Sequence, residues 1–260
     1  MSASRNHQIE VISKMWQIVE TLREARDGLT LHALAGQTGQ VKSSIHRILR
    51  TLAHHGYVEQ THRGGAYRLG VKFLSLAAGV REGLNLVEIT RPFARELKDK
   101  FDESTYLAVL RAGEGVFVDV QETHRDLRLV GPLGARVHFH ATAAGKIMAA
   151  YFPEPEQQKL LRATPHARGI WEQTRELGYG INDEETIPGA VFVAGPLFDT
   201  TGSVCGSISL GMPKHRYTDA LRQTLPAEVR ACCHRASRAL AAAHYVHVNA
   251  FSETATGAFA

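Results

Sequence analysis

The sequence predicts an α+β protein built from an N-terminal helical part and a larger part that mixes strands with helices. In the first seventy residues, apolar side chains recur at helical spacing before a short alternating segment. Further along, several alternating runs are separated by helix-like segments. Charge divides the same way: residues 1–72 hold 10 Lys+Arg against 5 Asp+Glu (+5), and residues 73–260 hold 20 against 21 (−1). This asymmetry indicates a nucleic-acid-binding part attached to a part with another task.

Composition excludes several classes of protein. Hydrophobic content of 44% and charged content of 22% are typical of a globular chain. We expect no membrane span, because no apolar run is long enough, and no signal peptide, because MSASRNHQIE lacks an apolar core. The cysteines Cys205, Cys232 and Cys233 are too few to form a disulfide framework, which favours a cytoplasmic location.

The N-terminal part, residues 1–70, is predicted to contain three helices. Ile9–Arg26 is amphipathic, with an apolar stripe that we expect to be buried, formed by Ile9, Ile12, Trp16, Val19 and Leu22. Thr30 is a suitable N-cap for a second helix, and Gly39 can end it in a left-handed conformation. The third helix carries its core residues at positions i, i+3, i+4 and i+7, namely Ile45, Ile48, Leu49 and Leu52.

The polar face of the third helix fits a DNA major groove. It presents Ser43, Arg47 and Arg50, flanked by Ser44 and His46, and Lys42 lies near the helix start. Arginine can bind guanine with two hydrogen bonds, whereas serine and lysine can hold phosphates. The alternative is that these charges simply form a solvated helix face.

A hairpin is predicted directly after these helices. Residues 57–60 and 66–69 alternate as strands do, and the turn between them contains His62, Arg63 and two glycines. Helix-turn-helix followed by a hairpin with a basic tip is a winged helix-turn-helix, and Arg63 could reach the DNA. Residues 71–84 should form a linker helix whose apolar side suggests a dimer contact.

Residues 85–246 are predicted to form the second domain. We expect helices at residues 86–102 (containing Pro92), 142–152, 154–163, 169–177 and 216–245, the last interrupted or kinked at Pro226. Strands are expected at residues 105–110, 115–123, 127–130, 179–183, 189–198 and 203–211. Such a mixture is typical of an α+β sensor domain. Residues 247–260 are expected to be a disordered tail.

A small-molecule site is predicted where the helix at residues 142–152 begins. Thr142 can cap that helix, and Ala143, Ala144 and Gly145 are small enough to leave the free N–H groups open to a carboxylate. Ser207 and Ser209 share one side of a strand and could bind the same ligand. The alternatives are that Thr142 is a plain cap and that the serines face solvent. Lys146 is interpreted as a surface residue.

Taken together, several motifs resemble the IclR family of bacterial transcriptional regulators. They are GLTLHALAGQTGQVKSSIHRILRTLAHHGYVEQ, GGAYRLG, HATAAGKIMAAYFP, LGYGINDEE, PGAVFVAGPLFD and GSISLGMP, which occur in family order between Ile9 and Ala243. The resemblance implies a winged helix-turn-helix, a linker helix and a GAF-like effector-binding domain. It further implies dimers or tetramers on a near-palindromic operator in double-stranded DNA, responding to small organic acids.

The resemblance also bears on individual site residues. It adds Asp183 to the effector site and places the start of the 142–152 helix and the serine pair in the pocket. Phe192 stands where many relatives carry a small polar residue that faces the effector, so its ring should shrink the pocket or change the preferred ligand. The segment from Arg162 to Trp171 is shorter than usual, which should alter one wall of the pocket.

Enzymatic activity is not expected. The chain lacks a G-x-S-x-G elbow, a complete phosphate-binding loop and an H-E-x-x-H pair. His138 and His140 alternate on a predicted strand, but no cysteine or carboxylate completes a metal site there, so neither metal nor cofactor is expected. A DNA-binding protein without an effector is disfavoured by the large neutral second part. The sequence does not identify the operator, the effector or the direction of regulation.

Overall fold

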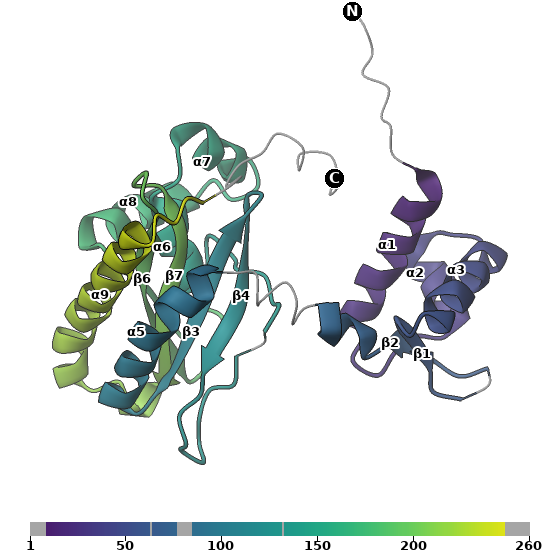
Figure 1. The fold of residues 1–260 in the computed structure, drawn as a ribbon, viewed down its shortest axis with the longest axis horizontal. Helices are drawn as coiled ribbons and strands as arrows, with labels where there is room; N and C mark the ends of the chain where they lie inside the picture. The colour runs from purple at the N-terminus through teal and green to yellow at the C-terminus, as the bar shows by residue number, and fades with distance from the viewer. Residues whose placement is uncertain (1–8, 63, 77–84, 132, 248–260) are drawn as a thin grey trace, which may run out of the picture. The chain divides into compact units, whose positions relative to one another are not determined.

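The computed structural model describes residues 9–62, 64–76, 85–131 and 133–247. The chain divides into two compact units, residues 1–83 and residues 84–260 (Figure 1). Both helices and strands are present, so the predicted α+β class is confirmed. Each unit is described by itself.

The first unit packs three helices against a two-stranded ribbon. These are α1 (Glu10–Glu24), α2 (Leu31–Thr38), α3 (Lys42–His54), β1 (Val58–Gln60) and β2 (Tyr67–Leu69). The Thr30 side chain accepts a hydrogen bond from Ala33 N at 3.2 Å, and Gly39 ends α2 at φ 67°, both as predicted. The four predicted core residues of α3 are all buried. This unit is a winged helix-turn-helix.

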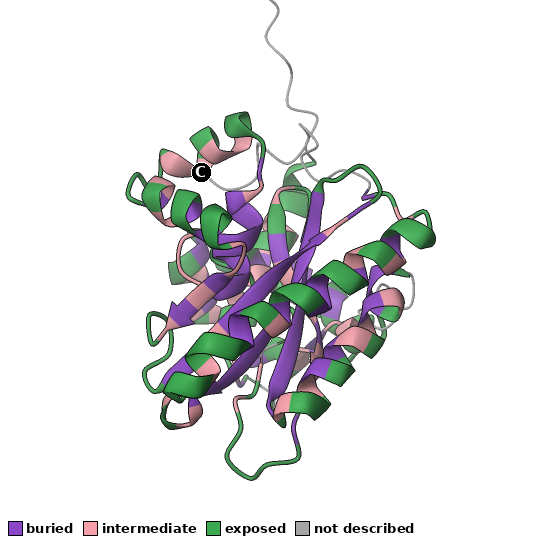
Figure 2. Ribbon diagram, turned by 90° about the vertical axis from the view of Figure 1, so that its left-hand side faces the viewer, coloured by how far each residue is buried: buried purple, intermediate pink, exposed green. Residues whose placement is uncertain are grey.

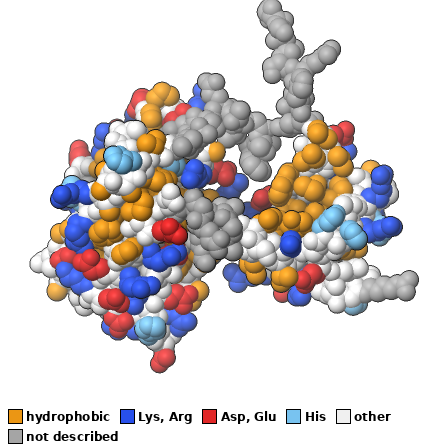
Figure 3. All heavy atoms as spheres, viewed as in Figure 1, with side chains coloured by type: hydrophobic (Ala, Val, Ile, Leu, Met, Phe, Trp, Pro, Cys, Tyr) orange, Lys and Arg blue, Asp and Glu red, His pale blue; other side chains and the backbone are white. Residues whose placement is uncertain are grey.

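Helix α1 departs from the prediction on its first two turns. Val19 and Leu22 are buried, but Ile9, Ile12 and Trp16 are 62%, 45% and 51% exposed. Ile18, outside the predicted stripe, is fully buried instead. The buried residues of α1 all lie in its second half, so the first half keeps an exposed apolar surface, which is visible over α1 in Figure 3. Within the predicted linker helix, residues 72–76 are helical, and residues 77–84 lie outside the described residues.

The second unit is built on a five-stranded antiparallel sheet of order β4-β3-β7-β6-β5. Its strands are β3 (Ser104–Arg111), β4 (Glu114–Gln121), β5 (Gly180–Asp183), β6 (Ala190–Phe198) and β7 (Val204–Pro213). Its helices are α5 (Asn85–Phe101), α6 (Ala143–Ala150), α7 (Glu154–Leu161), α8 (Ala167–Leu177) and α9 (Asp219–Ala242), with a short 3-10 turn, η1 (Lys214–Arg216), before α9.

Helices cover both faces of this sheet. Helices α5 and α9 pack side by side on one face, where the apolar residues of β3, β6 and β7 form the largest core (Figure 1). Helix α6 lies on the opposite face, with α8 packed against it. The three central strands β3, β6 and β7 are therefore buried on both sides, and the helices keep exposed outer faces (Figure 2). A buried sheet face under a short helix is the setting of the site described below.

Two expectations for this unit were wrong, and one alternative of a third is excluded. Residues 127–130 form no strand, because they belong to a loop whose backbone binds side chains, such as Tyr106 Oη to Leu129 O at 2.6 Å. His138 and His140 lie in loop and turn and do not alternate on a strand. For Pro226 the structure excludes an interruption, because the residue lies buried inside a continuous α9, and the expected kink stays a prediction.

The chain after α9 returns to the sheet. His247 N donates to Asp199 Oδ2 at 2.9 Å, and the His247 side chain is buried. The rest of the expected tail, residues 248–260, lies outside the described residues.

Candidate functional site

The outer face of α3 carries the predicted DNA-binding residues. Lys42, Ser43, His46, Arg47 and Arg50 are exposed, and Ser44 is half-buried. Arg63, on the wing, lies outside the described residues. Because the aliphatic residues of α3 pack into the core, its polar residues must point outward, as an i, i+3, i+4, i+7 pattern requires.

The arginines of α3 keep their charge available. Arg47 and Arg50 form no ion pair with any residue that the structure describes. In the same unit, Arg23 pairs with Glu20 at 2.8 Å and Arg68 pairs with Glu59 at 3.1 Å. Unneutralised guanidinium groups on one helix face can bind phosphates or base edges without first breaking an internal contact.

The predicted small-molecule site begins at the first turn of α6. Thr142 Oγ1 accepts from Gly145 N at 3.1 Å, so the predicted cap is confirmed. The N–H groups of Ala143 and Ala144 precede the first intrahelical donor and donate to none of the described residues. Gly145 is needed here, because a Cβ would lie 2.2 Å from His138 O. The helix start is therefore packed tightly and retains two free donors.

Ser207 and Ser209 lie under this helix and not in solvent. Ser207 is 0% exposed and Ser209 is 2% exposed, which excludes the solvent-facing alternative. In register, Ser209 is opposite Ala194, which packs with Ala143 and Ile147 of α6. Residues paired across strands share a face, so both serines and the start of α6 border one interior region.

Two polar atoms in this region lack partners. Ser207 Oγ and Asn182 Oδ1 are fully buried and accept or donate no hydrogen bond in the structure. Asn182 Nδ2 donates to Ala141 O at 2.8 Å and to Thr186 Oγ1 at 3.0 Å, which fixes the amide and leaves its oxygen as an acceptor. Buried polar atoms are nearly always satisfied, so unpaired ones indicate a position that water or a ligand occupies.

Asp183 does not belong to this group. Its register partners Val191 and Met212 are in the core under α5 and α9, so Asp183 is on the opposite face of the sheet. There it pairs with Lys214, and Arg222 lies 3.9 Å from its other oxygen. The expectation for Asp183 is corrected by one position: Asn182 faces the site. Strand alternation relative to Phe192 could have revealed this from the sequence.

Phe192 narrows the site, as its size suggested. Its ring and that of Tyr106 meet edge to face, with centroids 5.7 Å apart, above Gly211. A Cβ at Gly211 would come within 2.5 Å of the Phe192 ring, so only glycine leaves both rings in place. Burial raises the pKa of Tyr106, whose hydroxyl stays protonated and donates to the Leu129 carbonyl. Two aromatic rings thus fill part of the space between β3, β6 and β7.

Lys146 is buried and not on the surface as expected. Its side chain is 7% exposed, and Nζ donates to Glu185 Oε1 and Oε2 at 2.5 and 2.6 Å and to Ile181 O at 2.9 Å. The Lys146–Glu185 pair joins the loop between β5 and β6 to α6, and Asn182 Nδ2 holds Thr186 of the same loop against β5. The loop between β5 and β6 is therefore fastened to the same helix that provides the free N–H groups.

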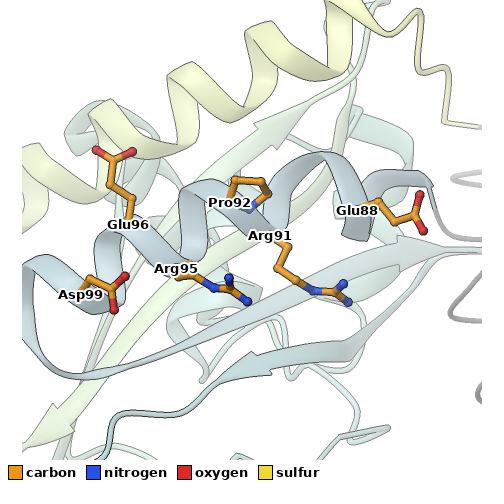
Figure 4. Close-up of a pocket in the computed structure, with 6 residues that line it drawn as sticks. All are labelled: Glu88, Arg91, Pro92, Arg95, Glu96 and Asp99. Atoms are coloured by element: carbon orange, nitrogen blue, oxygen red, sulfur yellow. The ribbon is translucent and has the colours of Figure 1, made fainter.

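The surface hollow beside α5 is less suited to ligand binding. A hollow of about 470 Å³ runs along α5, and all of its described lining residues come from that helix (Figure 4). Its charges are largely satisfied internally: Arg91 pairs with Asp119 at 3.2 Å, and Glu96 pairs with Arg235 at 2.7 Å. Among the described residues, no group of three or more His, Cys, Asp or Glu could hold a metal ion, and no helix could cross a bilayer.

These two units define a class of protein. A winged helix with free arginines on α3, joined to a sensor-type α/β unit with unsatisfied interior polar groups, is typical of a ligand-responsive transcriptional regulator. Family models agree: residues 11–62 match the IclR helix-turn-helix domain and residues 78–238 match the bacterial transcriptional regulator IclR C-terminal domain. The chain belongs to the IclR family, whose members are transcriptional regulators and not enzymes.

Relatives with known roles align over most of the chain. It is 29% identical to the HTH-type transcriptional regulator XynR of Escherichia coli, covering 82% of this chain and 89% of XynR. It is also 29% identical to the transcriptional repressor IclR of E. coli, covering 84% and 85%. The IclR transcriptional regulator of Alicyclobacillus acidocaldarius shares the fold, with a TM-score of 0.76 at 18% identity over 90% of this chain and 100% of that one.

A further structural relative carries a ligand. An IclR homologue from Microbacterium hydrocarbonoxydans, complexed with 4-hydroxybenzoate, has a TM-score of 0.72 at 18% identity, covering 89% of this chain and 99% of that one. At this identity the comparison supports the fold of the chain.

Proposed function

We propose that this IclR-family regulator binds a small organic acid between the first turn of α6 and the buried face of β5, β6 and β7. The observation that carries the proposal is that hydrogen-bond donors at the start of α6 and polar atoms on the sheet border the same interior region. The free N–H groups of Ala143 and Ala144 can bind a carboxylate. On the facing strands, Ser207 Oγ and Asn182 Oδ1 have no hydrogen-bond partner among the described residues. Ser209 completes the hydroxyl pair that faces the helix.

The geometry also restricts the chemistry of the acid. Asn182 offers only an oxygen acceptor, so the effector should carry a hydroxyl or another hydrogen-bond donor away from its carboxylate. Phe192 and Tyr106 supply ring edges, which favours a compact ligand with an apolar portion. The relative whose structure contains 4-hydroxybenzoate supports a hydroxylated acid in this class.

Binding would act on DNA through conformational equilibrium. An acid that bridges α6 to the sheet stabilises whichever arrangement of the β5–β6 loop, α6 and strands accommodates it best, and operator affinity changes only if it prefers one state. The Lys146–Glu185 pair joins that loop to α6, so a bound acid that moves α6 would also move the loop. We place this regulator in the cytoplasm.

In the first unit, we propose that α3 lies in the major groove of a near-palindromic operator. Its contact residues are Lys42, Ser43, Ser44, His46, Arg47 and Arg50, with Arg63 at the wing. Replacing Arg47 by Ala should weaken operator binding by about 1–3 kcal/mol, or roughly 5- to 150-fold, because one arginine–base contact is lost. Arg23→Ala removes a paired arginine from α1 and serves as the control.

Fluorescence anisotropy with operator and scrambled duplexes separates a loss of sequence-specific binding from a general loss of DNA affinity. The Arg47→Ala protein should lose affinity mainly for the operator, whereas Arg23→Ala should bind as the parent does. Unchanged operator affinity in Arg47→Ala would refute the assignment of α3.

We also propose that the active species is a homodimer or homotetramer, because two half-sites need two winged helices. Support comes from the exposed apolar side chains of α1, Ile9, Val11, Ile12 and Trp16, which a second copy could cover. Trp16→Lys should therefore raise the dimer dissociation constant at least about tenfold, the effect of roughly 1.4 kcal/mol of lost burial. Sedimentation velocity over a concentration series tests this, and an unchanged distribution in the variant would exclude α1 from the interface.

A further inference from the structure

A second hollow lies between α9 and the end of β6, away from the start of α6. It has a volume of about 570 Å³. Strand β5 pairs with β6 only from Val191 to Ala194, so the last residues of β6 have no neighbouring strand on that side. At this open edge Phe198 N donates to Ser237 Oγ of α9 at 3.0 Å, and Pro196 has no N–H to satisfy. Because β5 begins only at Gly180, opposite Ala194, a groove remains beside the last residues of β6.

The walls of this groove are apolar and partly aromatic. Tyr151 and Phe198 form one wall, with ring centroids 5.0 Å apart and planes at 87°. On the α9 wall, Ala227 and Ala231 are one turn apart, so two methyl groups stand where larger side chains would fill the space. A flat ring can lie against such a surface and meet the aromatic rings at their edges.

The rim of the groove is positively charged. Arg230 and His234 are one turn apart on α9, and no carboxylate is among the described lining residues. Neither side chain forms an ion pair with any residue in the described part of the chain. The Arg175 guanidinium carbon lies 5.4 Å from the centre of the Tyr151 ring. By contrast, Arg235, on the same helix but outside the groove, pairs with Glu96 at 2.7 Å.

Gly178 leaves room for the Arg230 side chain at this rim. It ends α8 with φ 71°, and a Cβ there would lie 3.1 Å from Arg230 Nε. Absence of a side chain lets the guanidinium rest over the end of α8, next to the groove. A guanidinium group can donate two hydrogen bonds to one carboxylate, and an adjacent aromatic wall can contact a ring, so the groove matches the shape of an aromatic carboxylate.

We propose that this groove is a second ligand site, which binds a small aromatic carboxylate independently of the α6 site. Its volume falls within the range of small-molecule pockets. The ring would lie on Ala227, Ala231 and the aromatic wall, and Arg230 and His234 would bind the carboxylate. Because the groove is formed by α9, α8 and the end of β6, it gives the regulator a second chemical input.

The test uses sodium benzoate with the full-length protein labelled with ¹³C on alanine methyl groups. The methyls of Ala227 and Ala231 report on the groove, and those of Ala143 and Ala144 report on the α6 site in the same spectra. We expect the Ala227 and Ala231 signals to shift along a saturating curve. Benzyl alcohol, which keeps the ring and lacks the charge, should shift them far less.

Variants decide whether the rim charges cause binding. The double variant Arg230→Gln/His234→Gln should bind benzoate at the groove at least about tenfold more weakly, as expected for lost charge-assisted hydrogen bonds. Arg235→Gln removes a charge from the same helix outside the groove and should leave the curve unchanged. Arg230, His234 and Arg235 are all exposed, so the variants should fold.

Unshifted or non-saturating Ala227 and Ala231 signals would overturn the second site, as would an unchanged curve in the double variant. Shifts at Ala143 and Ala144 alone would support the proposed α6 site and still exclude the groove.

Discussion

Ser207→Ala should leave the ligand-free protein at least as stable as the parent, although it removes a polar group from the core. Ser207 Oγ is fully buried without a hydrogen-bond partner. Burying an unsatisfied hydroxyl costs about 1–3 kcal/mol relative to water. Removing one oxygen atom leaves a small void, which costs only about 0.3 kcal/mol. The variant should therefore gain up to about 1–2 kcal/mol in its free energy of unfolding.

Ser237→Ala is the matched control. Ser237 Oγ donates to Cys233 O at 2.8 Å and accepts from Phe198 N at 3.0 Å, so both of its roles are satisfied. Deleting it leaves the Phe198 N–H without its partner and should destabilise the protein by about 1–2 kcal/mol. The same chemical change should thus shift stability in opposite directions at the two positions.

Urea unfolding followed by circular dichroism, at fixed protein concentration and without organic acids, measures both variants. The midpoint should rise or stay constant for Ser207→Ala and fall for Ser237→Ala, with slopes unchanged. Ser207→Ala should also weaken the effect of an effector acid on operator binding. A drop in stability at Ser207 similar to that at Ser237 would mean that Oγ has a hydrogen-bond partner in the free protein, and would contradict its assignment as an unsatisfied buried group.

Two further predictions concern packing and pH. Gly145→Ala would place a Cβ 2.2 Å from His138 O, a backbone atom that cannot move easily, and should cost about 1–3 kcal/mol. Gly169→Ala, with nothing within 4 Å, is its control in the same urea assay, and equal stability of the two variants would contradict the packing at α6. For Asp199, burial raises the carboxyl pKa, but hydrogen bonds from Thr201, Ser203 and His247 outweigh it and lower the pKa. Because the folded pKa is below the unfolded value of about 3.9, the carboxylate stabilises the protein above that pH and loses this effect as pH falls through the folded pKa. The stability gap between the parent and Asp199→Asn should thus be widest near neutral pH and shrink on acidification, and a gap independent of pH would refute this.

Local patterns were enough to predict the first unit. The spacing of Ile45, Ile48, Leu49 and Leu52 fixed the orientation of α3, and the caps at Thr30 and Gly39 are set by side chain and backbone preferences within a few residues. The exposed start of α1 could not be predicted in this way. Its apolar stripe predicts that these residues are buried, but periodicity does not say whether the burying surface belongs to the same chain or to a partner.

The site at the start of α6, in contrast, depends on contacts between residues that are distant in sequence. Periodicity placed Ser207 and Ser209 on one side of a strand, but only the position of α6 shows that this side is buried. The choice between Asn182 and Asp183 depends on strand register, and a shift of one residue reverses the face. Lys146 was expected on the surface because lysines usually are, whereas its partner Glu185 is 39 residues away.

The most direct test of the account measures operator affinity and acid response together. Fluorescence anisotropy should follow the purified protein on duplex DNA from upstream of its own gene and on a scrambled duplex, at several salt concentrations, with and without a panel of small hydroxylated and plain organic acids. We expect selective binding with a steep salt dependence, altered by at least one acid in the parent protein and much less in Ser207→Ala. Selective binding that every acid changes equally in both proteins, or that no acid changes, would contradict the proposed site between α6 and the sheet.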